Sequence, residues 1–324
     1  MENVSANISH VRNSSGALPD PPSGRQHEIT SGGYRAVITE VGAALRRLSH
    51  DDRPLVVGFS IDELMPAYRG AQLIPWPNRI RDGRYEFAGA QHQVPITEIE
   101  RNNALHGLVV WESWRTVLHV RDRVVLSHRI QPRDGYPWRL DVTADFALGP
   151  DGLRCTVEAL NTGDSPAPYG YGPHPYLQAG ESPLDEWSLE IPAEKYLEVT
   201  PDRLLPTEVV SVTDTEKDFR EEREIGATKL DHAYTDIRRD ASGTATVRVR
   251  DPRGKTGVEM SWPSTAPWVQ VHTADLPDPA NDRLGLAVEP MTCPPDAFNS
   301  GTDLIVIEPG DSHRTSWTIR AIRD

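Results

Sequence analysis

The feature that most constrains the fold of this chain is a two-residue alternation of apolar and polar side chains, repeated in many short segments. Successive side chains of a β-strand point to opposite faces of its sheet, so the alternation predicts strands with one buried face and one solvated face. Such strands are typical of antiparallel sheets. The clearest alternating segments are residues 115–120, 124–130, 153–160, 246–250 and 315–320.

Turn-forming pairs of residues punctuate these segments, whereas a sustained helical period of 3.6 residues is scarce. The chain also has 28 prolines and 24 glycines, which favour loops over long helices. We therefore expect an all-β fold, a large antiparallel β-sandwich with few short helices. The pairs that mark turns include Gly32-Gly33, Asp82-Gly83, Asp134-Gly135, Asp151-Gly152 and Ser242-Gly243.

The domain organisation follows from the distribution of polar and turn-forming residues along the 324-residue chain. Residues 1–26 are rich in Ser, Asn, Pro and Gly and offer little apolar surface to offset the entropy cost of ordering, so we expect a disordered tail. No internal linker separates two cores, and β-sandwiches of this size commonly form one domain. Residues 27–324 are predicted to be a single domain.

The formal net charge of −14 argues against two classes of partner, nucleic acids and anionic membranes. No segment approaches the roughly 20 apolar residues of a membrane-spanning helix, and no basic region followed by an apolar run marks export. We expect a cytoplasmic protein, either a monomer or a weak homodimer, with a small molecule as its partner.

Several well-known catalytic motifs are absent, including the glycine-rich nucleotide loops, the G-x-S-x-G nucleophile turn and H-E-x-x-H. The His, Cys, Asp and Glu residues do not show metal-ligand spacing either. We therefore look for polar residues held in loops rich in proline, glycine and aromatic residues, where binding groups commonly lie on a rigid scaffold.

The first such loop follows Ile74, where two prolines surround Trp76 and are followed by Asn78 and Arg79. The guanidinium of Arg79 is able to donate two parallel hydrogen bonds to a pair of ligand oxygens. From this segment alone, a surface arginine paired with an acidic residue is the simpler explanation.

Two histidines lie in similarly constrained segments. His106 precedes a glycine that permits close approach of the backbone, although a lone histidine is usually structural. His174 lies between two prolines and near Tyr176, which leaves its backbone little freedom. The sequence leaves two interpretations of His174: it is a site residue, or it belongs to a loop that is merely rigid.

Two carboxylates complete the candidate site. Asp231 offers a hydrogen-bond acceptor, or it is simply a turn residue. Glu289 ends an apolar, strand-like run, where loss of water would raise the pKa of its carboxyl group towards the range of a working base. The rings of Trp76, Tyr171 and Trp268 could cover the apolar face of a sugar, although most aromatic residues only pack a core.

Taken together, these segments resemble the aldose 1-epimerase, or galactose mutarotase, family from roughly Thr30 to Arg323. The resemblance implies the galactose mutarotase-like supersandwich, which agrees with the expected sandwich. The matching stretches, in chain order, are Asn78-Arg79-Ile80 with Gly83-Arg84-Tyr85, Asn103 to Gly107, His174-Pro175-Tyr176, Leu230-Asp231, Glu289-Pro290 with Pro295 to Asn299, and Glu308-Pro309-Gly310.

The resemblance also implies a mechanism that interconverts the α and β anomers of a free aldohexose. Glu289 would take the proton from the anomeric hydroxyl, and His174 would protonate the ring oxygen. His106 would support the shift of charge, while Arg79 and Asp231 would hold hydroxyl groups. By the same resemblance no metal or organic cofactor is needed, and Asn78, Trp76 and Tyr176 are further candidates for contact with the sugar.

Three other functions remain open from the sequence. An epimerase for a phosphorylated or sulfonated hexose would need additional cations at the site, for which Arg69, Arg81 and Lys229 are candidates. A non-catalytic sugar-binding protein would not need both an acid and a base. A glycosidase using Asp231 and Glu289 would need their carboxyl groups roughly 5 to 9.5 Å apart.

Overall fold

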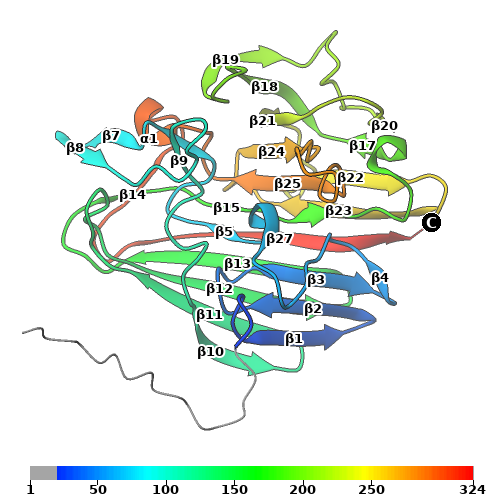
Figure 1. Ribbon diagram of the computed structural model, residues 1–324, viewed down its shortest axis with the longest axis horizontal. Helices are drawn as coiled ribbons and strands as arrows, with labels where there is room; N and C mark the ends of the chain where they lie inside the picture. Colours follow the sequence, from blue (N-terminus) through cyan, green and yellow to red (C-terminus); the bar gives the residue numbers. More distant parts are fainter. Residues whose placement is uncertain (1–19, 324) are drawn as a thin grey trace, which may run out of the picture.

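Three antiparallel sheets carry most of the chain in the computed structural model, which describes residues 20–323 (Figure 1). In this part of the chain, helices are limited to single turns: η1 (Pro66–Tyr68), η2 (Leu184–Glu186) and α1 (Ala297–Ser300). The expected all-β sandwich with few short helices is confirmed.

The largest sheet has nine strands, and the last strand in the sequence lies at its centre. All five alternating segments singled out in the sequence are strands of this sheet. In spatial order the strands are β10 (Arg115–Val120), β11 (Arg123–Ile130), β12 (Leu140–Gly149), β13 (Gly152–Asn161), β27 (Ser312–Arg323), β23 (Thr256–Trp262), β22 (Ala245–Asp251), β17 (Ser188–Glu190) and β20 (Arg223–Glu224).

The alternation separates core from solvent in most of these strands, as the sequence predicts. The prediction is wrong for β10, where five of the six residues are exposed because this strand lies at the edge of the sheet. Along β12, buried side chains alternate strictly with partly exposed ones, and β22 shows the same pattern. The buried positions, among them Phe146 on β12 and Trp317 on β27, join one large apolar core. Burial of this apolar face supplies the main favourable free energy of the fold.

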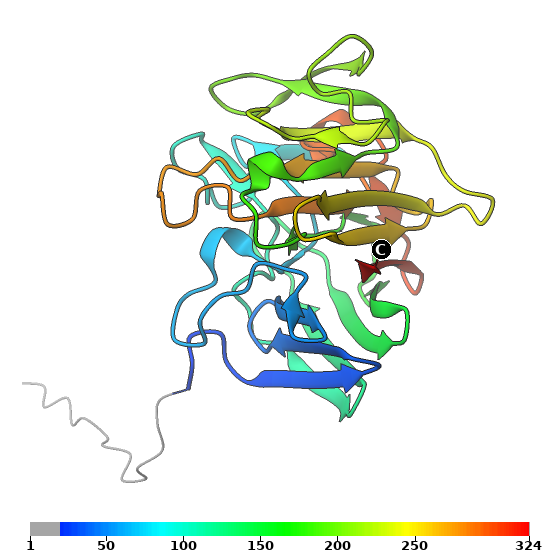
Figure 2. The same ribbon diagram turned by 90° about the vertical axis from the view of Figure 1, so that its right-hand side faces the viewer.

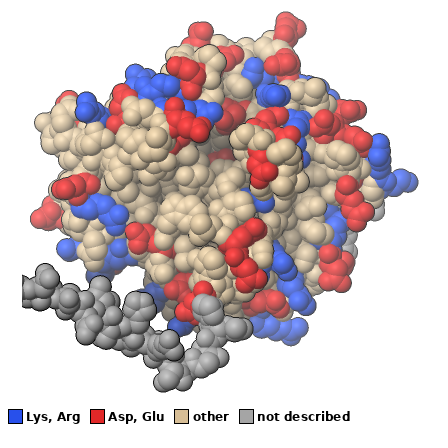
Figure 3. All heavy atoms as spheres, viewed as in Figure 1, with Lys and Arg blue, Asp and Glu red and all other residues tan. Residues whose placement is uncertain are grey.

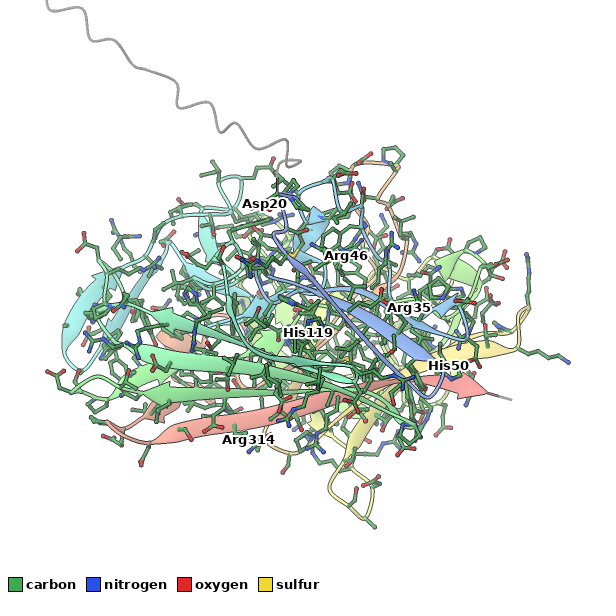
Figure 4. The ribbon with its side chains drawn as sticks, turned by 90° about the horizontal axis from the view of Figure 1, so that it is seen from below. Asp20, Arg35, Arg46, His50, His119 and Arg314 are labelled. Atoms are coloured by element: carbon green, nitrogen blue, oxygen red, sulfur yellow. The ribbon has the colours of Figure 1, made fainter. Side chains whose placement is uncertain are left out.

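A four-stranded sheet covers part of the large sheet. Its first two strands pack on β11, β12 and β13. Seen from below, Arg35 marks this sheet, and Arg314 lies on the far side of β27 from it (Figure 4). The strands are β1 (Gln26–Ser31), β2 (Tyr34–Thr39), β3 (Leu45–His50) and β4 (Arg53–Pro54).

The third sheet has six strands, which lie towards the top of the molecule while the four-stranded sheet lies at the bottom (Figure 2). Val269, Val271 and Val288 project from one face of it into the large apolar core. In spatial order the strands are β16 (Tyr176–Leu177), β25 (Leu286–Met291), β24 (Trp268–His272), β21 (Asp231–Ile237), β18 (Ala193–Val199) and β19 (Pro206–Ser211).

Four short strand pairs connect these sheets and shape the loops between them. Each pair is antiparallel and joins segments that are two to four residues long. The pairs are β14 (Ala167–Tyr169) with β26 (Ile305–Ile307), β15 (Gly172–Pro173) with β5 (Gln72–Leu73), β6 (Arg79–Arg81) with β9 (Asn103–Leu105), and β7 (Arg84–Phe87) with β8 (Ala90–Gln93).

The predicted tail boundary needs a correction at its end. Residues 1–19 lie outside the described residues, but residues 20–26 already pack against the domain. Ser23 is buried and its carbonyl accepts a hydrogen bond from the N–H of Val41, and Gln26 pairs with Thr39 as the first residue of β1. These backbone hydrogen bonds offset the polar composition that suggested disorder.

Two further findings concern residues 20–323. None of the helices there is long and apolar enough to cross a membrane. Cys155 and Cys293 are both buried free thiols.

Candidate active site

Glu289 lies on β25 in the middle of the six-stranded sheet, opposite Gln270 of β24. All six residues of β25 are buried, and only 2% of the surface of Glu289 is exposed. Burial, assisted by the negative charge of Asp231 and opposed by Arg79, raises the pKa of the Glu289 carboxyl well above its ordinary value. Its Oε2 has no hydrogen-bond partner among the described residues. Glu289 therefore carries a carboxyl group within a buried strand. Because its pKa is raised, its ionised form is a stronger base than an ordinary carboxylate.

His174 lies beside Glu289, with 3.5 Å between its Nε2 and Oε1 of the carboxyl group. Its backbone is fixed from both sides, because its N–H donates to the carbonyl of Ala71 and its carbonyl accepts from the N–H of Gly70. Burial, followed by the nearby His272, lowers the pKa of His174 to about 3. The imidazole is therefore neutral near pH 7, with its Nδ1 unpaired among the described residues.

Glu289 and His174 act as one unit, since their pKa values are displaced in opposite directions. These shifts favour the neutral pair, with the proton on the carboxyl group of Glu289 next to an uncharged imidazole. Moving that proton to His174 leaves the number of bound protons unchanged and gives a carboxylate next to an imidazolium. Two such groups can exchange the roles of acid and base during one reaction.

His106 approaches His174 edge to face, with 5.0 Å between the ring centroids. It follows β9 with a φ of 63°, and its N–H donates to the carbonyl of Asn78. The next residue, Gly107, has a φ of 77°, and a Cβ there would lie 2.1 Å from the carbonyl oxygen of Ile74. Only glycine allows this close approach, so the tight turn positions His106.

Arg79, at the start of β6, does not have a free guanidinium. Its Nε and Nη2 each donate to one oxygen of Glu98, both at 2.9 Å, and its Nη1 donates to Oδ1 of Asn78. Burial alone would lower the pKa of Arg79, but the hydrogen bonds that it donates to Glu98 and the charge of Asp231 outweigh burial and raise it. The pairing fixes Arg79 as a permanent positive charge near both Asp231 and Glu289.

Asp231 begins β21 and joins the site through Gln270. The amide Nε2 of Gln270 donates to Oδ1 of Asp231 at 2.6 Å, while Oε1 of Gln270 is buried without a partner among the described residues. Burial raises the pKa of Asp231, but His272, Arg79 and the Gln270 hydrogen bond together outweigh burial, and the net shift is downward. The lowered pKa of Asp231 favours an ionised carboxylate that accepts hydrogen bonds, whereas the pKa of the nearby Glu289 carboxyl is raised.

Tyr68 and Trp111 form an aromatic border next to the histidines. The ring of Tyr68 lies 4.7 Å from that of His106 and 5.9 Å from that of Trp111, which is half exposed. Tyr68 and Ala67 have φ values of 58° and 45°, in the left-handed region that residues with a Cβ rarely adopt. This strained turn points the phenol ring towards the site.

The predicted aromatic residues occupy different places. Tyr176 stacks on His174 at 5.3 Å, with an angle of 11° between the rings. Trp76 is buried and contacts Phe298 edge to face, with its indole nitrogen unpaired among the described residues. The other two have polar partners: the hydroxyl of Tyr171 donates to Gln72, and the indole of Trp268 donates to Asp303.

The three cations considered for an anionic sugar also differ in position. Lys229 is exposed, and Arg81 is half exposed and within 3.6 Å of Asp296. Arg69 is buried, lies over the ring of Tyr176 at 5.5 Å and donates from Nη2 to Asn281. Its Nε is unpaired, and none of the carboxylates in the described range forms an ion pair with it.

Sequence reasoning missed four residues of this site. Glu98 lies in a turn-rich segment, and Tyr68 owes its place to a strained backbone, so neither has a recognisable local signal. Gln270 and His272 did carry one, because they alternate with valines in the run Trp268 to His272. That pattern matches an ordinary half-exposed strand, and only the sheet order reveals that its polar face lines the site.

Unpaired polar atoms converge at this place: Oε2 of Glu289, Nδ1 of His174, Nδ1 of His106 and Oε1 of Gln270. Buried polar atoms in folded proteins nearly always have partners, so a cluster of orphaned ones is typical of a site for a polar ligand. A hollow opens near the middle of the face in Figure 3, where β24 and β21 lie in Figure 1. Within residues 20–323, no group of three or more His, Cys, Asp and Glu residues is arranged to hold a metal ion.

Comparisons with solved structures show the same fold. An aldose epimerase homologue from C. elegans superimposes with a TM-score of 0.82 at 23% identity, covering 92% of this chain and 99% of that one. A galactose 1-epimerase from Lactobacillus acidophilus NCFM gives a TM-score of 0.76 at 20% identity, covering 90% and 92% of the two chains. The galactose mutarotase-like architecture is therefore confirmed.

Comparisons of sequence reach closer relatives. The chain is 35% identical over 298 residues to the uncharacterized protein YihR of Escherichia coli K12, covering 92% of this chain and 93% of that protein. It is 29% identical over 160 residues to the aldose 1-epimerase of the same organism, 48% of this chain and 45% of that protein. Residues 25–320 match the family model for aldose 1-epimerase. The chain belongs to the aldose 1-epimerase family.

Proposed function

We propose that this protein is an aldose 1-epimerase that interconverts the α and β anomers of a free aldohexose. The observation that carries the proposal is the buried pair of Glu289 and His174, whose Oε1 and Nε2 lie 3.5 Å apart. Opening a pyranose ring requires removal of a proton from the anomeric hydroxyl and delivery of one to the ring oxygen. An acid and a base held on the same sugar meet both requirements.

The proposed reaction starts with Glu289 ionised and His174 protonated in the sugar complex. Glu289 takes the proton of the anomeric hydroxyl while His174 gives its proton to the ring oxygen, and the bond between that oxygen and the anomeric carbon breaks. Rotation about the bond between the first two carbons presents the other face of the aldehyde. The reverse transfers close the ring as the second anomer and restore both groups.

Neighbouring residues favour the ionised form of the pair once a sugar is bound. Arg79 opposes the upward shift of the pKa of Glu289, which burial and Asp231 cause. Sugar hydroxyl groups that donate to Oε2 of Glu289 would stabilise its carboxylate further. His106 contacts His174 edge to face, where it supports the shift of charge during the reaction. Asp231 accepts hydrogen bonds from hydroxyl groups of the sugar.

Polarimetry of freshly dissolved α-D-glucose and α-D-galactose tests this proposal. The wild-type protein is expected to accelerate mutarotation of at least one of these sugars, and Glu289→Gln is expected to lose about 10²- to 10⁴-fold in kcat. Glu208→Gln is the matched control, because Glu208 lies exposed on β19 of the same sheet. Acceleration that survives in Glu289→Gln would remove Glu289 from the mechanism.

Arg69 favours a second candidate, a 1-epimerase of an anionic hexose. A buried guanidinium without a carboxylate partner is costly, and an anionic group on the ligand would relieve that cost. The test compares glucose with glucose 6-phosphate and a 6-sulfonated hexose. For this candidate, the anionic sugar should have the higher kcat/KM, and Arg69→Gln should remove the preference while Arg81→Gln retains it. Equal loss for neutral and anionic sugars in Arg69→Gln would argue for a structural role.

A non-catalytic sugar-binding protein is the remaining alternative, and the same series separates it. Such a protein binds the sugars but leaves the spontaneous rate of mutarotation unchanged. A glycosidase would instead release sugar from a glycoside, which the proposed reaction does not do. The buried acid–base pair supports the epimerase over the binding protein, because sugar binding alone does not require a proton shared between two groups.

A further inference from the structure

His272 is a third imidazole on the polar side of the six-stranded sheet. It lies on β24, two residues beyond Gln270, and therefore on the same face of the sheet as Gln270 and Glu289. His272 lies directly opposite Asp231 of β21, and its charge contributes to the pKa shifts of both Asp231 and His174. The acid–base mechanism proposed above does not use His272.

The orientation of this imidazole is fixed by its backbone neighbour. Its Nδ1 lies 3.0 Å from the carbonyl oxygen of Leu230. A carbonyl oxygen only accepts hydrogen bonds, so Nδ1 must carry a hydrogen, and in the neutral ring Nε2 then carries the lone pair. The same carbonyl also accepts from the N–H of Thr273, which anchors it. In the described residues, Nε2 of His272 has no hydrogen-bond partner, and the ring is only partly buried.

The cross-strand neighbours of His272 place it in relation to Asp231 and to the strand of Glu289. Asp231 is its partner on β21, and Ala287 is its partner on β25. Ala287 is fully buried, and the side chains of Tyr176 and Ala274 pack with it. The Ala287 position lies two residues from Glu289, about 7 Å along the strand. That spacing is close to the width of one pyranose ring.

We propose that His272 is a specificity-determining residue, whose Nε2 accepts a hydrogen bond from a sugar hydroxyl on the far side of the ring from the anomeric centre. This inference rests on the proposed function. The hydroxyl group donates, and a second acceptor, Asp231, lies next to the imidazole. A hexose that lacks this hydroxyl, or carries a bulky group there, is bound less well.

The test combines His272 variants with a set of monodeoxy hexoses, each lacking one hydroxyl group of the hexose that the protein turns over fastest. His272→Phe keeps a ring but removes the acceptor, and we expect kcat/KM for the parent hexose to fall roughly 10- to 100-fold. One deoxy sugar lacks the hydroxyl group that donates to Nε2. For that sugar, the kcat/KM values of the variant and the wild type should agree within about twofold, because neither protein forms this hydrogen bond. His272→Gln, which carries an amide near the position of Nε2, should recover part of the loss.

His128→Phe is the matched control, because Nδ1 of His128 also contacts a backbone carbonyl, that of Ser113, but on the large sheet. It should leave every kcat/KM unchanged. Equal losses in His272→Phe for all sugars, or no loss for any sugar, would overturn the role of His272. Sugar binding, followed by tryptophan fluorescence, uses the same design without turnover. A wild-type protein that binds these sugars without accelerating mutarotation would contradict the proposed function alone, and the binding constants would still decide the role of His272.

Discussion

The two larger sheets of this protein use polar residues on their strands in different ways. On β11 and β12 of the nine-stranded sheet, charged residues alternate with buried ones and pair at the surface, as Arg129 does with Asp141. On β24 and β25 of the six-stranded sheet, Gln270 and Glu289 are buried and have unpaired polar atoms. Polar side chains on the strands therefore face water in one sheet and the candidate site in the other.

The difference lies in what covers each polar face. Water satisfies exposed groups on the large sheet, so their ion pairs contribute little to stability. Loops from elsewhere in the chain cover the polar face of the smaller sheet and exclude water, which displaces the pKa values of Glu289 and His174. Function is expected where buried polar groups are left without partners, because natural folds seldom retain that cost otherwise.

The largest expected effect is on kcat, and it distinguishes His174 from His313, a histidine with a partly similar local environment. His174→Asn should lower kcat by about 10²- to 10⁴-fold, because it removes the group proposed to protonate the ring oxygen. His313 on β27 of the large sheet also has a pKa lowered by burial and an unpaired Nδ1. His313→Asn should leave kcat unchanged. Polarimetric rates of both variants check this, and an equal loss in the two would erase the distinction between the sheets.

The next effect concerns stability. Glu98→Ala removes one partner of the buried pair with Arg79, and we expect a loss of about 3–5 kcal/mol in the free energy of unfolding. The surface pair of Arg129 and Asp141 provides the comparison, since Asp141→Ala should not measurably change the denaturation midpoint. Urea unfolding followed by fluorescence measures both. A small loss in Glu98→Ala would mean that water reaches Arg79.

A third prediction concerns the pH dependence of the free energy of unfolding, which reports whether Glu289 is protonated in the folded protein. The folded protein retains a proton on Glu289 at pH values where the unfolded chain, with an ordinary carboxyl pKa of 4.5, has lost it. That contribution to stability is present below pH 4.5 and is lost as pH rises. Glu289→Gln removes the penalty, so its stability relative to the wild type should increase above pH 4.5, by at most about 1.4 kcal/mol per pH unit.

His174 contributes with the opposite sign. Its folded pKa of about 3 is depressed from 6.5, so its contribution is present above pH 6.5 and is lost as pH falls towards 3. Above pH 4.5 the contribution of Glu289 falls with rising pH while that of His174 still increases up to pH 6.5, so the two contributions oppose each other in the wild type. Urea unfolding of the wild type and Glu289→Gln from pH 4 to 9 measures the difference. A difference that does not depend on pH would mean that Glu289 is ionised in the empty site.

The smallest expected effect lies at the border of the site. Trp111→Ala should raise KM severalfold while leaving kcat nearly constant, because an exposed ring tilted against Tyr68 contributes to binding but not to proton transfer. Val117→Ala is the control, since Val117 is similarly exposed but lies on β10 of the large sheet. A fall in kcat for Trp111→Ala would mean that Trp111 also influences the chemical step.

The sequence predicted the strands of the large sheet well, because their alternation reflects local burial. It also singled out Glu289 and His174, each of which stands out in its own segment. It did not predict that β16 pairs with β25, a contact between residues more than 100 positions apart that brings His174 to Glu289. Pairings of this kind depend on the packing of the whole chain, and no local pattern encodes them. For the same reason Glu98 and His272 became recognisable only in three dimensions.

The position of β27 between β13 and β23 has a consequence for synthesis of the protein. Until residues 312–323 emerge from the ribosome, β13 and β23 have one unpaired edge each, and the two halves of the large sheet are not joined. Exposed strand edges are sites of aggregation. A nascent chain of this protein therefore depends on its last strand for solubility, and chaperones that shield strand edges would act during this interval.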